Sequence, residues 1–229
     1  MNLNKRLSKS IKTLKLYNSM IFDVRFREDE FIKKGYEKAM KELNDFFEIN
    51  WQRNKPKIFL MADRKTIDEH RQAKTEKWNT GYVSNNDLFI LAPENYNKES
   101  THNFSEKEYF SLIKHELAHL FELVLSKNKK MPDWIWEGLA LYLAGQVNDN
   151  KKPPKLSNFL DYYDKSGKGV YAEAGFAVKF LIEKYGKEKI LKLLKEIKNL
   201  NSKEDFYRAF KAIYGFDLDY KNFNISSEV

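Results

Sequence analysis

Cysteine is absent from this chain of 229 residues. Its absence excludes disulfide bonds, a thiolate nucleophile and a zinc site built on cysteine. Any tightly bound metal ion must therefore be held by histidine nitrogen and carboxylate oxygen. Histidine is scarce as well, since the chain has four, so two histidines that fall close together are informative.

Long hydrophobic runs are absent too. No stretch approaches the roughly 20 apolar residues of a membrane-spanning helix. A basic N-terminal extension, residues 1–19, has apolar residues at helical spacing, but lysines interrupt it, so it lacks the apolar run of a secretory signal. We therefore expect a cytoplasmic protein, with attachment to a surface or membrane through the basic extension as an open alternative.

The charge balance is positive, with a formal net charge of +8. Such a charge favours anionic partners, but no nucleic-acid-binding motif accompanies it, so we do not expect nucleic acid as a partner. Hydrophobic residues make up 42% of the chain and charged residues 32%, which is typical of a soluble folded domain. None of these properties indicates an oligomeric state.

The spacing of apolar residues predicts an α+β fold with a small mixed sheet. Strands are expected near residues 20–26, 57–62, 80–84 and 87–92, the last two joined as a hairpin. Helices are expected at 28–48, at 105–126 with a capping-box pattern at Ser105 and Glu108, from 132 to Gly145, and at 172–185, 188–199 and 203–214. Residues 66–77 fit either a polar helix or a loop.

These elements predict one domain over residues 20–229, with a sheet-containing lobe at 20–126, a mostly helical lobe at 127–229 and a cleft between them. The stretch 146–168 is rich in Asn, Lys, Pro and Gly, and we expect it to be a long surface connection that lines the cleft.

The expected helix at 105–126 contains an H-E-x-x-H motif, His115-Glu116-Leu117-Ala118-His119. The i,i+4 spacing places both imidazoles on one helix face, about 6 Å apart at their roots. Glu116 is turned by about 100° from His115 around the helix, so it can stand beside a metal ion as a base without binding it. The motif therefore predicts two zinc ligands and a catalytic carboxylate. The other histidines, His70 and His102, lie among polar residues and are expected to be exposed.

Catalytic zinc usually has three protein ligands and one open position, so a third donor is needed. Glu137 is an acid inside an otherwise apolar helical stretch, where an unpaired charge would cost several kcal/mol. Coordination of zinc would offset that cost. The alternative is a buried salt bridge.

The order of these motifs resembles that of the gluzincin peptidases, in particular the peptidase MA-like family, and more distantly the zinc aminopeptidases. Seventeen residues separate the H-E-x-x-H motif from Glu137, which lies in a helical stretch of the pattern W-x-x-E-G-L-A-x-Y that begins at Trp134. The resemblance covers residues 20–220 and implies a zincin-like fold with the H-E-x-x-H helix at the active site. It implies a Zn²⁺ cofactor held by His115, His119 and Glu137.

The same resemblance implies a zinc-dependent peptidase that acts on a peptide or protein, in which a zinc-bound water is activated by Glu116. The stretch that begins Tyr171-Ala172-Glu173 is similar to the later helix of the family that carries a transition-state tyrosine. A core tyrosine that packs on Phe176 is the alternative for Tyr171.

The chain departs from thermolysin-like enzymes at Leu141, where those enzymes have an acid that orients a ligand histidine. The support for the ligand histidines must come from elsewhere, and Glu122 and Asp133 are the candidates.

Two other functions stay open. One is a catalytically silent zincin-fold protein that binds a peptide or a partner, although Glu116 is unnecessary for zinc binding alone. The other is a basic nucleic-acid-binding or regulator-binding module with structural zinc, although structural sites usually have four protein ligands.

Overall fold

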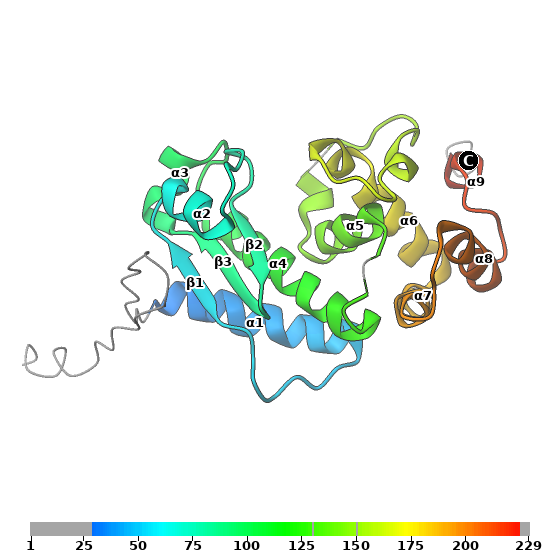
Figure 1. Cartoon of the computed structure of the whole chain (residues 1–229), viewed down its shortest axis with the longest axis horizontal. Helices are drawn as coiled ribbons and strands as arrows, with labels where there is room; N and C mark the ends of the chain where they lie inside the picture. The colour runs from blue at the N-terminus through cyan, green and yellow to red at the C-terminus, as the bar shows by residue number, and fades with distance from the viewer. Residues whose placement is uncertain (1–28, 130, 150, 225–229) are drawn as a thin grey trace, which may run out of the picture. The chain divides into compact units, whose positions relative to one another are not determined.

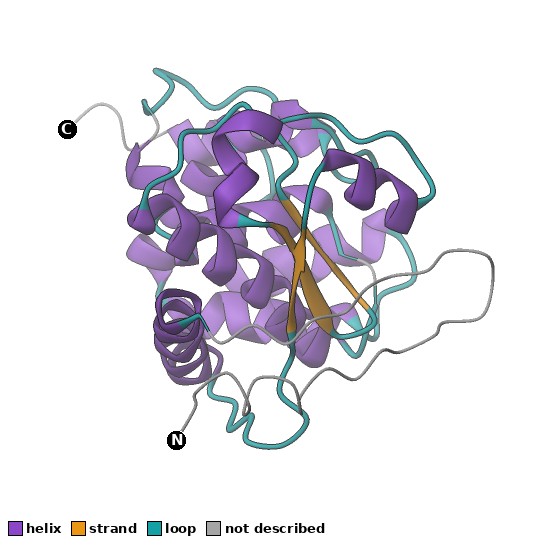
Figure 2. Cartoon of the chain, turned by 90° about the vertical axis from the view of Figure 1, so that its left-hand side faces the viewer, coloured by secondary structure: helices purple, strands orange, loops and turns teal. Residues whose placement is uncertain are grey.

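The computed structural model describes residues 29–129, 131–149 and 151–224 (Figure 1). The expected strand at 20–26 and the basic extension at 1–19 lie outside these ranges. From Gly35 onward the described residues form one compact unit, and the first turn of helix α1 (Glu30–Phe47) belongs to a separate N-terminal unit. The fold is α+β, with many helices and one small sheet (Figure 2).

The sheet contains three strands in the described ranges, β1 (Ile58–Met61), β2 (Gly81–Ser84) and β3 (Asp87–Leu91), in the order β1-β3-β2. Strand β1 runs parallel to β3, whereas β2 and β3 form the expected antiparallel hairpin. Phe59, Phe89 and Tyr82 lie in register across the strands, with ring centroids 5.0 and 5.3 Å apart. This row of stacked rings lies on one face of the sheet.

Helix α4 (Glu106–Ser126) contains the H-E-x-x-H motif and contacts both the sheet and the later helices. The Ser105 hydroxyl accepts a hydrogen bond from the Glu108 backbone N–H at 3.1 Å, which caps the helix as expected. The buried Tyr109 donates its hydroxyl hydrogen to the Leu91 carbonyl at 2.9 Å, so the first turns of α4 are fixed to the end of β3. The helix contacts β2 and β3 as well as α5 and α7.

The remaining helices follow the expected pattern closely at α5 (Asp133–Leu143), α6 (Ala174–Tyr185), α7 (Lys187–Ile197) and α8 (Lys203–Tyr214). The stretch 66–77, for which a helix or a loop was expected, contains both: helix α2 (Arg64–Arg71) covers its first part and a loop follows. The short helices α3 (Tyr96–Glu99) and α9 (Tyr220–Asn224) were not expected. Within the described ranges, none of these helices has both the length and the apolar character that a membrane crossing requires.

The connection at 146–168 is less exposed to solvent than its composition predicts. It contains the 3-10 turns η4 (Gln146–Asp149) and η5 (Phe159–Asp161), and a third, η6 (Lys168–Ala172), follows. Val147, Leu156 and Phe159 are buried. The buried Glu173 carboxylate accepts hydrogen bonds from the backbone N–H groups of residues 157–159, at 2.8, 2.8 and 3.1 Å. This carboxylate fixes the connection to the start of α6.

Helices α5 and α6 approach each other closely at a glycine. A Cβ atom added at Gly138 would lie 2.6 Å from the Ala174 carbonyl oxygen and 2.8 Å from Val178 Cγ2. Only hydrogen fits at this position of α5, so the backbones of the two helices are nearly in contact one residue after Glu137.

Candidate metal centre

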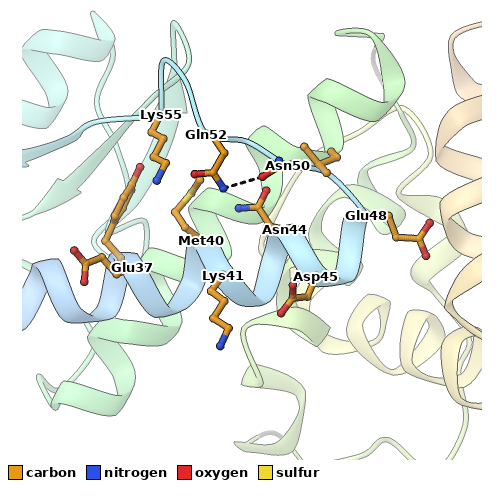
Figure 3. Close-up of a pocket in the computed structure, with 11 residues that line it drawn as sticks. Glu37, Met40, Lys41, Asn44, Asp45, Glu48, Asn50, Gln52 and Lys55 are labelled. Atoms are coloured by element: carbon orange, nitrogen blue, oxygen red, sulfur yellow. Dashed lines mark hydrogen bonds between the residues drawn. The ribbon is translucent and has the colours of Figure 1, made fainter.

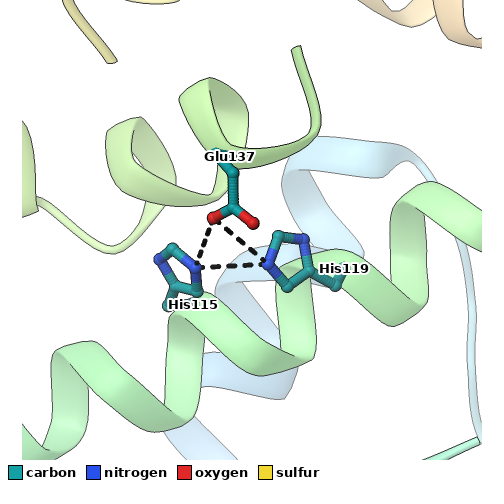
Figure 4. A group of neighbouring side chains, drawn as sticks. All are labelled: His115, His119 and Glu137. Carbon is teal, nitrogen blue, oxygen red and sulfur yellow. Dashed lines mark hydrogen bonds and ion pairs between the residues drawn. The ribbon is translucent and has the colours of Figure 1, made fainter. Parts of the chain in front are cut away.

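The three side chains predicted from the sequence to be metal ligands meet in one place. His115 and His119 project from α4, and Glu137 points from α5 toward both imidazoles (Figure 4). Their donor atoms all lie within 4.8 Å of one another. The two histidine side chains are 9% and 5% exposed and that of Glu137 is 16% exposed, so the group is nearly enclosed by protein.

The spacing of the donors fits a tetrahedral ion. His115 Nε2 lies 3.2 Å from His119 Nε2 and 3.3 Å from Glu137 Oε2, and the His119 Nε2 to Glu137 Oε2 distance is 3.8 Å. For metal–ligand bonds of about 2.0–2.1 Å, neighbouring donors around a tetrahedral ion lie about 3.3 Å apart. Two imidazole nitrogens and one carboxylate oxygen are also the donor types that zinc accepts when cysteine is absent.

Glu137 Oε2 is buried and has no hydrogen-bond partner among the described residues, although His115 Nε2 lies within ion-pair distance. Among the described residues no lysine or arginine pairs with Glu137, so a salt bridge to one of these side chains does not explain its burial. A metal ion between the three donors would satisfy this oxygen.

The outer nitrogens of the two imidazoles have different partners. His115 Nδ1 lies 2.8 Å from Gln146 Oε1, and His119 Nδ1 lies 3.1 Å from Glu122 Oε2. An imidazole whose Nδ1 donates to one of these oxygens has its lone pair on Nε2, and this is the form that binds a metal ion between the histidines and Glu137. Trp136 stacks on the His119 ring with centroids 4.1 Å apart and an interplanar angle of 4°.

Of the two expected supporting acids, only Glu122 contacts a ligand. Asp133 instead accepts a hydrogen bond from the Ser166 hydroxyl, so it holds the connection that follows α5 rather than a histidine. Glu122 is fully buried, and its second oxygen, Oε1, has no hydrogen-bond partner. Burial, and then the Glu137 charge, raise the pKa of Glu122 well above its usual value.

Glu116 is buried beneath the edge strand of the sheet. A Cβ atom at Gly81 of β2 would lie 2.9 Å from Glu116 Oε1, so the glycine provides the room that this carboxylate occupies. Burial raises the pKa of Glu116 to about 7, the Glu137 charge adds to this effect, and the His115 and Arg71 charges oppose it. A dication held by the triad would lower this pKa, because a positive charge stabilises the carboxylate.

The electrostatics of the triad favour neutral imidazole at His119 and ionised carboxylate at Glu137. Burial lowers the pKa of His119 to about 3. Burial opposes the charge of Glu137, but the interactions of this carboxylate with His115, His119 and Tyr171 outweigh burial and lower the pKa of Glu137. Neutral imidazole and ionised carboxylate are the forms that bind metal ions.

Tyr171 lies beside Glu137, in the turn η6 before α6. Burial, and then the charges of Glu137 and Glu116, raise the pKa of its phenol, so the hydroxyl keeps its proton at neutral pH. Its ring makes an edge-on contact with Trp78, centroids 5.7 Å apart, and not with Phe176 as the alternative of a packing tyrosine required.

The other two histidines are less exposed than the sequence predicts. His70 is half-buried, with its ring 4.3 Å from that of Phe89, and His102 is half-buried with Nε2 3.0 Å from the Trp78 carbonyl. Neither belongs to the metal triad.

A polar groove of about 720 Å³ runs along α1 beside residues 48–55 (Figure 3). Glu37, Lys41 and Lys55 place charges of both signs on its walls, and Gln52 Nε2 donates a hydrogen bond to Asn50 Oδ1 at 2.8 Å. No residue of the metal triad lines this groove.

Comparisons with models of protein families, with curated proteins and with solved structures found no match for this chain.

Proposed function

We propose that this protein is a zinc-dependent peptidase of the gluzincin type, with a zincin-like fold. The observation that carries the proposal is the donor set: two imidazole nitrogens and one carboxylate oxygen at tetrahedral spacing, with the carboxylate of Glu116 beside them. Three protein ligands leave a coordination position open, as in catalytic rather than structural zinc sites.

Zinc bound by the triad would supply Lewis acidity, which acidifies water and polarises a peptide carbonyl. The buried Glu116 carboxylate accepts a proton from the attacking water and passes it to the leaving amine. Tyr171 keeps its phenol hydrogen and donates a hydrogen bond to the oxygen on which negative charge develops. Gln146 and Glu122 hold the two imidazoles in the tautomer that directs Nε2 to the metal.

The Glu116→Gln variant tests the proposal. The amide is nearly isosteric with the carboxylate but cannot accept the proton, so we expect hydrolysis to fall by about 10²–10⁴-fold. Zinc content should stay near one ion per chain, since Glu116 is not a ligand in this assignment. Cleavage of a pool of randomised dodecapeptides, read by mass spectrometry, and metal analysis measure the two quantities.

Glu106→Gln is the matched control, because Glu106 is an exposed acid in the first turn of the same helix. It should cleave peptides like the unmodified protein. If the zinc-loaded protein cleaves no peptide in the pool, the peptidase proposal is wrong and a silent peptide-binding or partner-binding protein becomes the better description. Normal turnover in Glu116→Gln would instead contradict the role of this residue.

A further inference from the structure

Trp78 connects the loop before the edge strand of the sheet to the segment that carries Tyr171. Its indole contacts the Tyr171 ring edge-on, with centroids 5.7 Å apart and an interplanar angle of 66°. Trp78 lies between α2 and β2, whereas Tyr171 lies in η6, far along the chain. Both residues are half-buried. The contact therefore joins two segments that are distant in sequence.

The backbone around Trp78 is held by side chains from outside its loop. The Arg64 guanidinium donates to the Asn79 carbonyl at 2.6 Å and to the Lys77 carbonyl at 3.3 Å, and His102 Nε2 lies 3.0 Å from the Trp78 carbonyl oxygen. Three consecutive carbonyl groups are thus bound. Loops are usually more mobile than the elements that they connect, so these bonds make Trp78 a fixed support for the ring that it contacts.

Tyr171, the other partner of the contact, belongs to a segment that packs beside the metal triad. Turn η6 packs on α5, and the Ala174 carbonyl, three residues after Tyr171, lies against Gly138, the residue that follows Glu137. A half-buried ring can occupy more than one staggered rotamer, and a change of χ1 carries its hydroxyl several ångströms away. An edge-on contact with a fixed aromatic ring favours one of these rotamers.

We propose that Trp78 is a positioning residue, which holds the Tyr171 ring in the rotamer that keeps its hydroxyl at the candidate metal centre. The inference rests on the proposed peptidase function and on the role of Tyr171 in it. A hydrogen bond to a developing oxyanion requires a donor in the right place, and a misplacement of about 1 Å can cost about 10²-fold in rate. Trp78 acts on the reaction through this hydroxyl, which a double-mutant cycle detects.

The cycle combines Trp78→Leu with Tyr171→Phe. We expect Trp78→Leu alone to lower kcat by about tenfold or more and to leave KM within about twofold. In the Tyr171→Phe background the same substitution should change kcat by less than about twofold, because the hydroxyl that it misplaces is already absent. Steady-state kinetics on a peptide found with the randomised pool, at equal zinc content, compare the four proteins.

Equal losses of kcat in both backgrounds would mean that Trp78 contacts the substrate or only supports the fold, and either result would overturn the inference. A normal kcat in Trp78→Leu would overturn it as well. A normal kcat in Tyr171→Phe would remove the hydroxyl from the mechanism and the inference with it, but would leave the peptidase proposal standing.

Trp51→Leu is the matched control, because it removes another half-buried indole with an edge-on ring contact, in this case to Phe121. It should leave kcat unchanged for each folded molecule. Trp78→Phe retains an aromatic ring at the contact and should lose less kcat than Trp78→Leu. Its loss should also disappear in Tyr171→Phe, so this variant completes the test if Trp78→Leu does not fold.

Failure of the peptidase proposal is a distinct result, because the mobility of the Tyr171 ring can be measured without turnover. When 3-fluorotyrosine replaces Tyr171, its fluorine lies on one edge of the ring, so ¹⁹F NMR follows rotation of the ring between two orientations. We expect this exchange to be about tenfold or more faster in Trp78→Leu, as for a ring released from its neighbour. An unchanged exchange rate would show that the ring is held without Trp78 and would refute the inference.

Discussion

Tyr171 has its hydroxyl beside Glu137 and its ring against Trp78, so a catalytic and a packing role predict different effects of removing one oxygen atom. If the hydroxyl donates to the developing oxyanion, Tyr171→Phe should lower kcat by about 10²-fold or more. Zinc content and melting temperature should stay unchanged, because the ring contact is retained. Steady-state kinetics, metal analysis and thermal melting measure these three quantities.

Tyr163→Phe is a suitable control, because Tyr163 is a half-buried tyrosine whose ring contacts are with Phe206 and Tyr207, away from the triad. It should leave kcat unchanged. If Tyr171→Phe melts at a lower temperature while each folded molecule turns over normally, Tyr171 is a packing residue and the catalytic assignment is wrong.

At the scale of single residues, the sequence predicts charged site residues better than neutral ones. The i,i+4 spacing selects His115 and His119, and a carboxylate in an apolar helix is costly enough to draw attention to Glu137. Gln146 and Trp136 are uncharged and only partly buried, so no comparable cost draws attention to them in the sequence. Their contacts with the imidazoles depend on how α5 and the chain after it pack on α4, which spacing alone does not determine.

Between elements, the near contact of α5 and α6 at Gly138 sets the position of Glu137. An added methyl group would collide with the backbone of α6, which cannot move aside as a side chain can. We expect Gly138→Ala to destabilise the fold by about 1–3 kcal/mol and to weaken zinc binding, because α5 must shift. Chemical denaturation and a competition assay with a zinc chelator check the two effects.

The sign of the stability change in Gly138→Ala distinguishes a close approach of the two helices from a loose one. Helix propensity alone predicts that Ala in place of Gly inside a helix stabilises by about 1 kcal/mol. A more stable Gly138→Ala protein with unchanged zinc affinity would mean that the two helices have room to separate, and that their approach does not position Glu137.

Among the elements, long amphipathic segments were predictable and short ones were not. Helices α4 and α6–α8 repeat apolar residues over three or more turns, so their periodicity is clear in the sequence. Helices α3 and α9 have four and five residues, too few for a repeat to be visible. The buried residues in 146–168 were missed because the Glu173 carboxylate, distant in sequence, satisfies the backbone there.

For the molecule as a whole, the triad joins α4, which contacts the sheet, to α5, which packs on the later helices. Zinc binding should therefore stabilise the folded unit. At a free zinc concentration 100 times Kd the gain is about 2.7 kcal/mol, which corresponds to a rise in Tm of about 5–10 °C for a protein of this size. Differential scanning fluorimetry with zinc and with a chelator measures the shift.

His119→Ala provides the comparison, since it removes one donor of the triad. Its Tm should respond little to zinc. A rise of the same size in this variant would place the stabilising ion at another site, and no response in the unmodified protein would argue against a metal centre.

The parallel stack of Trp136 on His119 gives the protein an optical probe of its own candidate site. Indole fluorescence is sensitive to electron transfer from the excited ring to a neighbouring imidazole, and this process depends on whether the imidazole is neutral, protonated or bound to a cation. Emission from Trp136 should therefore report the state of His119 directly. Metal titrations and rapid-mixing experiments can follow the site without a dye, with Trp136→Phe to identify the signal against the emission of the other tryptophans.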